Sequence, residues 1–189
     1  MSFSAPLTES WLQHFSIWLV TVALVVAAVI DGWKLKVPNW LTLPMIVGGW
    51  VYCGATLGWP GVGWSLAATA VGLALLLPLY AIGGMGAGDV KLLAGVGAWL
   101  ASPLTLTYAF CVSALIGGVI AVGMVAYRKA WDKHVGQFRA IAGEILTIRD
   151  PNRLSVIAAQ RKSSMLLLPY GIPIAIGSIL YFACTGMLI

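Results

Sequence analysis

The sequence predicts an all-α polytopic membrane protein, and two observations lead to this prediction. Hydrophobic residues make up 60% of the 189-residue chain and charged residues only 9%, with a mean hydropathy of +0.94; soluble domains carry about 25% charged residues. The charges are also clustered, which leaves residues 10–30, 37–88, 92–127 and 163–189 without any. A helix needs about 20 apolar residues to cross a bilayer. We therefore expect one membrane-embedded domain over residues 1–189 with six transmembrane helices.

The first three transmembrane helices are expected in the N-terminal half of the chain. The first covers residues 11–31, and it lacks the basic region of a cleavable signal peptide because no Lys or Arg precedes Lys34. The second charge-free stretch is too long for a single crossing. It is interrupted at residues 57–63, which contain three glycines and a proline. We therefore expect a second helix over 40–57 and a third over 64–82.

The remaining three helices follow a glycine-rich segment. Residues 83–88 include four glycines, which disfavour a helix there. A short fourth helix is expected over 89–101, where Ser102 and Pro103 follow. The fifth is expected over 104–127 and the sixth over 165–187. If the short fourth segment is re-entrant, the count of crossings falls to five.

The distribution of basic residues predicts how the chain is oriented in the membrane. With the N-terminus outside, Lys34, Lys36, Lys91 and the segment 128–162 all fall on the cytoplasmic side, so that all eleven basic residues lie on one face. Lys and Arg accumulate on that side of membrane proteins. The sequence therefore predicts a cytoplasmic loop over 128–162, whose eight basic and three acidic residues supply the formal charge of +5.

The basic loop contains an amphipathic pattern. Apolar residues recur at helical spacing between charged ones: Trp131, Val135, Phe138, Ile141 and Ile145. This pattern predicts an interfacial helix lying on anionic lipid headgroups. Membrane lipids are thus an expected partner. A nucleic-acid role is disfavoured, because a basic juxtamembrane stretch more often serves topology and lipid anchoring.

The cysteines and histidines give no sign of a metal site. Cys53, Cys111 and Cys184 each stand alone inside an apolar stretch, and His14 and His134 lie far from them and from each other. Zinc sites and disulfide frameworks need clustered cysteines or histidines. We therefore expect no metal and no disulfide.

The acidic side chains are the informative residues. Of six, Glu9 lies in the N-terminal tail and three lie in the basic loop, which leaves Asp31 at the end of the first helix and Asp89 at the start of the fourth. Both are expected at the cytoplasmic boundary of the membrane. Two carboxylates there suit acid–base hydrolysis of an amide, in which one is ionised and the other protonated. The helix dipole favours Asp89 as the base and Asp31 as the acid. Taken singly, Asp89 is also a plausible helix cap and Asp31 a plausible helix end.

Three motifs resemble those of a known family. Gly86-x-Gly88-Asp89, followed by Val90-Lys91, is similar to the GxGD signature of membrane aspartic peptidases. Asp31, followed by Val37-Pro38-Asn39, resembles the first-aspartate motif of the prepilin peptidases, and Leu168-Pro169-Tyr170-Gly171-Ile172-Pro173 resembles the start of their last helix. Because the three motifs occur in the family's order, the chain resembles a prepilin peptidase.

The resemblance implies an aspartic endopeptidase of the bacterial inner membrane that removes the leader from type IV prepilins at the cytoplasmic face. It implies that Asp31 and Asp89 are the catalytic pair, that Gly86 and Gly88 form a loop admitting substrate, and that Lys91 belongs to that loop. No metal or other cofactor is implied. Bifunctional members carry paired CxxC motifs that accompany N-methylation of the pilin. This chain has none, so it resembles the short, peptidase-only branch of tight-adherence (Flp) pilus systems.

Three alternatives stay open. The two aspartates suit a cation- or proton-coupled transporter or channel, although both are expected on one face and no inverted repeat is evident. The protein could also be a membrane scaffold without catalysis. A presenilin-like intramembrane protease shares GxGD, but its other aspartate usually follows a tyrosine, whereas Ile30 precedes Asp31 here.

Overall fold

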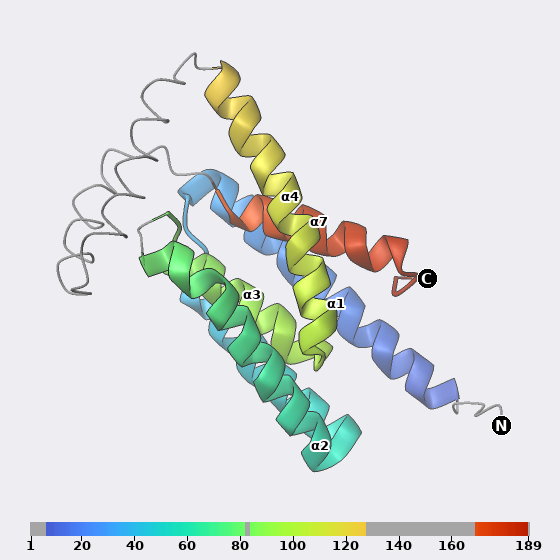
Figure 1. Ribbon diagram of the computed structural model, residues 1–189. Helices are drawn as coiled ribbons and strands as arrows, with labels where there is room; N and C mark the ends of the chain where they lie inside the picture. Colours follow the sequence, from blue (N-terminus) through green and yellow to red (C-terminus); the bar gives the residue numbers. More distant parts are fainter. Residues whose placement is uncertain (1–6, 82–83, 128–168, 189) are drawn as a thin grey trace.

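The computed structural model describes residues 7–81, 84–127 and 169–188, and every regular element in these ranges is a helix (Figure 1). In chain order the elements are α1 (Leu7–Lys34), α2 (Asn39–Ala81), α3 (Ala87–Leu100), α4 (Pro103–Tyr127) and α7 (Gly171–Cys184). The predicted all-α class is confirmed for the described residues. The interfacial helix predicted within 128–162, and Leu168 of the third motif, lie outside them.

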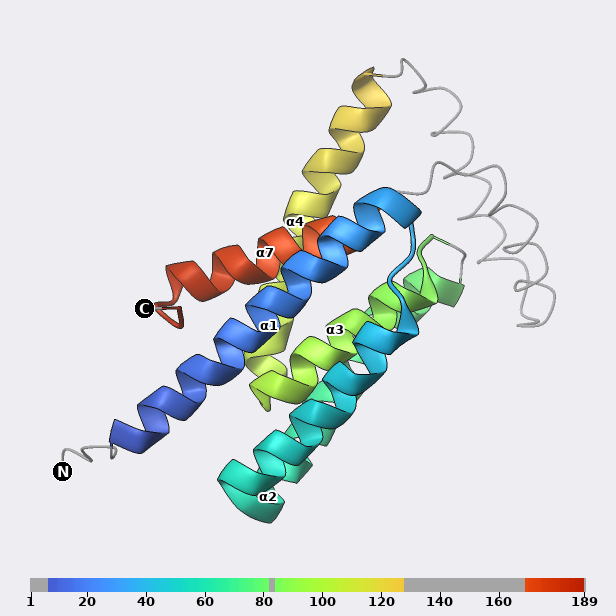
Figure 2. The same ribbon diagram turned by 180° about the vertical axis from the view of Figure 1, so that it is seen from behind.

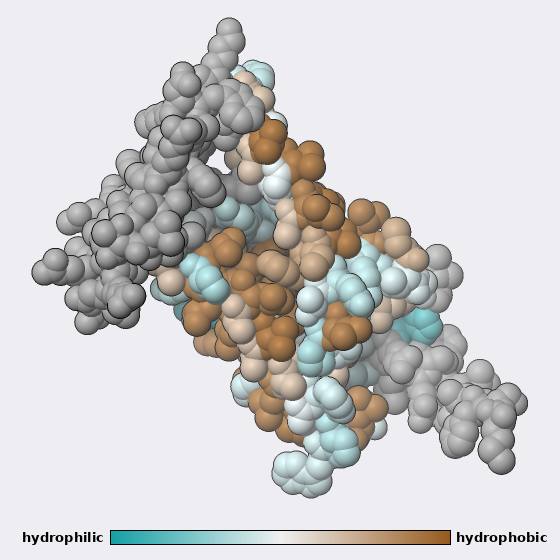
Figure 3. All heavy atoms as spheres, in the orientation of Figure 1, coloured by the Kyte–Doolittle hydropathy of each residue, from teal (hydrophilic) through white to brown (hydrophobic). Residues whose placement is uncertain are grey.

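The helices are those of a multi-pass membrane protein. Three of the described helices are long and apolar enough to cross a bilayer: α1 over His14–Lys34, the whole of α2, and α4 over Pro103–Met124. Large hydrophobic side chains such as Val22, Leu115 and Val119 are exposed on their outer faces. Figure 3 shows hydrophobic residues covering much of the visible surface around α4. A surface of this kind is stable against lipid and unfavourable in water.

Helix α2 is a hairpin of two arms. Gly58 has φ 67° and ψ −159°, outside the helical region, and it reverses the chain between a first arm (39–57) and a second arm (59–81). The indole N–H of Trp50 donates to the Thr69 hydroxyl over 3.0 Å and so joins the arms. The break predicted at 57–63 is thus present, but Gly58 alone is non-helical, since Pro60 and the other glycines fit the start of the second arm.

Helix α3 is the centre of the fold and is packed among the others. Leu92, Leu93 and Val96 are fully buried. The hairpin reaches α3 closely, because a Cβ on Gly49 would lie 2.7 Å from the Ala98 backbone and one on Gly97 would lie 2.6 Å from the Ala68 carbonyl oxygen. At 14 residues α3 is about 21 Å long, less than the roughly 30 Å of a bilayer core. Its burial among protein side chains explains how so short a helix is accommodated.

Helices α1, α4 and α7 form the other side of the molecule (Figure 2). Helix α4 contacts α7, where Gly177 lies against the Ser113 backbone and the Ser113 hydroxyl donates to the Ile174 carbonyl over 3.3 Å. Helix α1 also packs on α7. The start of α7 is thereby held beside the end of α1, although about 140 residues separate them in sequence.

The helix boundaries differ from the predicted ones at the two aspartates. Helix α1 continues past Asp31 to Lys34 and ends where Leu35 adopts a left-handed conformation with φ 50°. Helix α3 begins two residues before Asp89, at Ala87. Each carboxylate therefore lies inside a terminal helical turn. Helix α7 begins at Gly171, and residues 165–168 of the predicted sixth helix are not among those described.

Candidate active site

Asp31 is buried in the last turn of α1. Its backbone carbonyl accepts the N–H of Leu35 over 2.8 Å, which closes the helix. Only 2% of the residue is exposed. The carboxylate oxygen Oδ2 accepts the backbone N–H of Gly171 over 2.7 Å. A side chain at 171 would collide with this carboxylate, because a Cβ there would lie 2.8 Å from Oδ2. Gly171 therefore permits the approach of α7 to Asp31.

Asp89 is buried in the first turn of α3, with 5% of the residue exposed. Gly86 precedes the helix in an extended conformation, with φ −82° and ψ 149°. The Gly86 N–H donates to Asp89 Oδ2 over 3.2 Å, so this carboxylate caps its own helix from the third helical position. The capping function considered from the sequence is thus present, with Asp89 inside the helix rather than at the N-cap.

The first-aspartate motif and the GxGD motif are packed together. A Cβ on Gly88 would lie 2.5 Å from the Val37 carbonyl oxygen, so the absence of a side chain brings the start of α3 onto the segment after α1. The ammonium group of Lys91 donates to Asn39 Oδ1 over 3.0 Å. The sequence-predicted residues Gly88 and Lys91 therefore tie the two motifs to each other.

The third motif connects to both carboxylates. Gly171 donates to Asp31, and its neighbour Tyr170 is close enough to Asp89 to be influenced by its charge. Burial, and after it the negative charge of Asp89, raise the pKa of the Tyr170 phenol above its usual value. The phenol is therefore protonated at neutral pH. Tyr170 was not predicted as a site residue, although its position between the prolines of the third motif was the available signal.

The electrostatics of the pair differ from the expectation based on single helices. Asp89 lies at the N-terminal end of α3, where the helix dipole favours a negative charge. Asp31 lies at the C-terminal end of α1 but also accepts an N–H from Gly171, the first residue of α7. Each carboxylate thus has a helix N-terminus beside it. The dipole argument that made Asp89 the base and Asp31 the acid therefore no longer separates them.

The described residues offer no alternative centre built on a metal. Within residues 7–81, 84–127 and 169–188, no group of three or more His, Cys, Asp or Glu side chains could hold a metal ion. The three cysteines are free thiols, with Cys53 buried and Cys111 and Cys184 exposed. The buried carboxylates are the chemically distinctive groups, because acidic side chains buried in a membrane protein are costly and usually serve function.

The structure is that of a multi-pass helical membrane protein in which three motifs, two of them containing glycine, lie around two buried aspartates. These features define a membrane protein whose candidate chemical groups are carboxylates. Comparison with known sequences makes this class specific. A sequence model of the type IV leader peptidase family matches residues 18–122, more than half of the chain. The chain belongs to the type IV leader peptidase family.

Individual relatives agree with the family. The chain is 33% identical over 152 residues to a prepilin leader peptidase/N-methyltransferase of Aeromonas salmonicida strain A449. The match covers 74% of this chain and 50% of the relative. It is also 34% identical over 140 residues to the protein of the same name from Aeromonas hydrophila. That match covers 67% of this chain and 47% of the relative. The chain thus spans about half the length of the curated relatives it matches. No solved structure matches it.

Proposed function

We propose that this protein is an aspartic endopeptidase that removes the leader peptide from type IV prepilins at the cytoplasmic face of the bacterial inner membrane. The observation that carries the proposal is the convergence of three separate motifs on two buried carboxylates. Gly171 donates to Asp31, Gly88 packs on Val37, and Tyr170 lies within the electrostatic reach of Asp89. Family membership supplies the reaction class.

Asp31 and Asp89 are the proposed catalytic pair. One carboxylate, in its ionised form, takes a proton from a water molecule that attacks the scissile carbonyl. The other, in its protonated form, donates to the carbonyl oxygen and then to the leaving amine. No covalent intermediate is formed. Gly86 and Gly88 belong to the proposed active-site loop, in which Gly86 donates to Asp89, Gly88 packs on Val37 and Lys91 holds Asn39 beside them.

The proposed orientation has the N-terminus outside and six crossings, with the two arms of α2 counted separately and α3 and α7 as short crossings. Lys34 and Lys36 are exposed close to the end of α1 that carries Asp31, and Lys91 lies two residues after Asp89. These lysines therefore accompany the carboxylates at one end of the molecule. The positive-inside rule makes that end cytoplasmic.

We further propose that the protein cleaves Flp-type prepilins without methylating them. Cys53, Cys111 and Cys184 are isolated along the sequence, so the chain has no paired CxxC motifs of the kind that accompany methyl transfer in bifunctional members. The segment 128–162 is proposed as a cytoplasmic, lipid-binding loop within a single domain.

Co-expression with a Flp-type prepilin in a bacterium that lacks other prepilin peptidases tests these proposals. We expect the precursor to lose its leader on a gel, and mass spectrometry of the product to show an unmodified N-terminal amine. A methylated product would overturn the proposal of a peptidase without methyl transfer. An uncleaved precursor, together with carboxylate-dependent cation flux in proteoliposomes, would replace the peptidase by the transporter.

Replacing Gly171 by alanine is expected to lower kcat by at least about tenfold, because the new methyl group would displace the Asp31 carboxylate. Gly32→Ala is a matched control, since a Cβ at Gly32 meets only the end of the Ile172 side chain at 3.6 Å. Leader removal by the two purified variants is compared at saturating precursor. Equal kcat values would show that the Gly171–Asp31 contact does not position the carboxylate for catalysis.

A further inference from the structure

A pocket lies between the second arm of α2, α4 and α7. It has a volume of about 230 Å³ and is lined by Leu76, Leu79, Ala114, Gly118, Tyr170 and Ile174, among others. This volume is below the roughly 300–1,000 Å³ of a small-molecule site. It suits a few apolar side chains projecting from a helix. The pocket is partly open toward the surface, where Ala114 and Gly118 on α4 are exposed.

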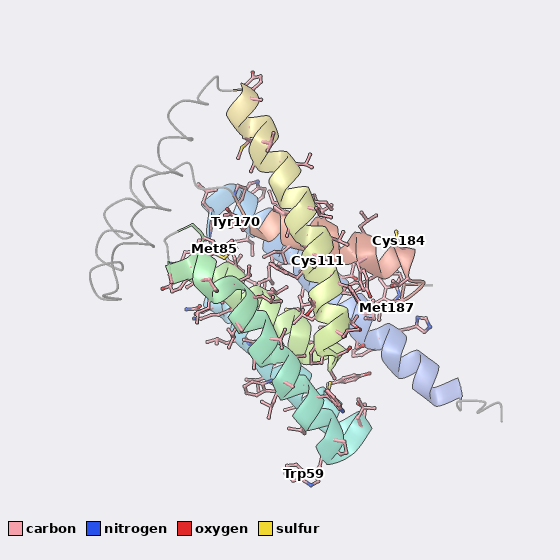
Figure 4. The ribbon with its side chains drawn as sticks, viewed as in Figure 1. Trp59, Met85, Cys111, Tyr170, Cys184 and Met187 are labelled. Atoms are coloured by element: carbon pink, nitrogen blue, oxygen red, sulfur yellow. The ribbon has the colours of Figure 1, made fainter. Side chains whose placement is uncertain are left out.

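The pocket lies beside the candidate active site. Two of its lining residues, Met85 and Tyr170, are direct sequence neighbours of residues that bind a carboxylate. Gly86 donates to Asp89, and Gly171 donates to Asp31. In Figure 4, Met85 and Tyr170 lie close to each other at the end of the molecule opposite Trp59, which marks the bend of α2. The pocket therefore adjoins the residues that bind both carboxylates.

The lining is suited to a hydrophobic helix. The hydroxyl of Ser113 donates to the Ala109 carbonyl over 2.8 Å and also to that of Ile174, so this polar group is satisfied within the protein. The face of α4 toward the pocket carries Ala114, Gly118 and Ala121. Small residues at this spacing allow a second transmembrane helix to approach closely. A Cβ on Gly118 would meet no atom within 4 Å, so space is open there.

We propose that this pocket binds the first apolar turn of the substrate's hydrophobic segment, immediately after the bond that is cleaved. The proposal rests on the proposed peptidase function, which requires the scissile bond at the carboxylates. The resemblance to prepilin peptidases implies that a hydrophobic segment of the precursor follows this bond. Tyr170 lines the pocket, and the next residue, Gly171, donates to Asp31. This position beside a carboxylate favours the substrate segment over a lipid chain, which has no reason to be aligned with the carboxylates.

Filling the pocket tests the proposal through substrate affinity. Gly118→Leu places a side chain in the open space and is expected to raise KM for a full-length prepilin about tenfold with a smaller change in kcat, because it removes ground-state binding. Gly123→Leu is the matched control on the same helix. Its Cβ also meets nothing within 4 Å, and Gly123 does not line the pocket. Equal KM values for the two variants would overturn the proposal.

A binding measurement separates failure of this proposal from failure of the peptidase function. A photo-crosslinking amino acid is placed at 118 or at 123 in the Asp31→Asn protein, which is expected to retain the precursor uncleaved. We expect crosslinks to the hydrophobic segment from 118 and few from 123. If wild type cleaves the precursor but position 118 crosslinks only to lipid, the pocket proposal is wrong while the peptidase stands. If wild type does not cleave, the peptidase proposal itself fails.

Discussion

Changing either buried carboxylate to its amide, Asp31→Asn or Asp89→Asn, is expected to reduce leader removal by a factor of about 10² to 10⁴. This is the usual contribution of a positioned acid or base. An amide side chain neither takes a proton from water nor donates one as a carboxylic acid does. The rate of cleavage of a purified prepilin, measured under single-turnover conditions, gives the size of the loss for each variant.

The fold is expected to survive both changes. An asparagine oxygen at 31 still accepts the N–H of Gly171, and one at 89 still accepts the N–H of Gly86. Each exchange also replaces a group that is costly to bury when charged by a neutral one. The free energy of unfolding should therefore change by no more than about 1 kcal/mol. Glu9→Gln, near the other end of α1, controls for loss of a negative charge elsewhere.

Cleavage that persists in either amide variant, at a rate similar to that of Glu9→Gln, would remove the two-carboxylate mechanism. Loss of cleavage with loss of the folded protein would instead point to a structural role, which a melting curve in detergent reveals. We expect Asp31→Asn and Asp89→Asn each to remain folded and to lose activity.

The helices were largely predictable because their signals are local. The charge-free stretches and the glycine-rich interruptions predicted where each helix lies, and the bend of α2 was expected at residues 57–63. The sequence predicts the end of this first helix at Asp31, where the apolar stretch meets a charged residue. The helix in fact continues to Lys34, and Asp31 in its last turn accepts the N–H of Gly171.

The site was only partly predictable. The sequence singled out two candidate carboxylates, and both are buried in the structure. The contact of Asp31 with Gly171, however, spans about 140 residues and arises from the packing of α1 on α7. The same contact places the N-terminus of α7 beside Asp31. The sequence of α1 alone could not predict this neighbour. Tyr170 was missed for a related reason. An aromatic residue at the start of an apolar helix is usually a core residue, and its relation to Asp89 exists only in three dimensions.

Gly88→Ala is expected to produce the second-largest loss, about a hundredfold in kcat. A Cβ at 88 would lie 2.5 Å from the Val37 carbonyl oxygen and 3.1 Å from the Val37 nitrogen, both of them backbone atoms that have little freedom to move. The start of α3 must then shift away from the segment that follows α1. Asp89 is the next residue, so the shift changes its position relative to Asp31. A misplacement of about 1 Å is enough for a loss of this size.

Gly88→Ala has two opposing effects on the free energy of unfolding. Alanine gains about 0.5–1 kcal/mol over glycine inside a helix, whereas overpacking typically costs about 1–3 kcal/mol, so a small net destabilisation is expected. Gly63→Ala is the matched control, because a Cβ there meets no atom within 4 Å and only the helical gain applies. We expect Gly88→Ala to bind precursor with nearly unchanged KM and to cleave it slowly. Equal kcat values for Gly88→Ala and Gly63→Ala would show that the close packing of Gly88 on Val37 does not align the carboxylates.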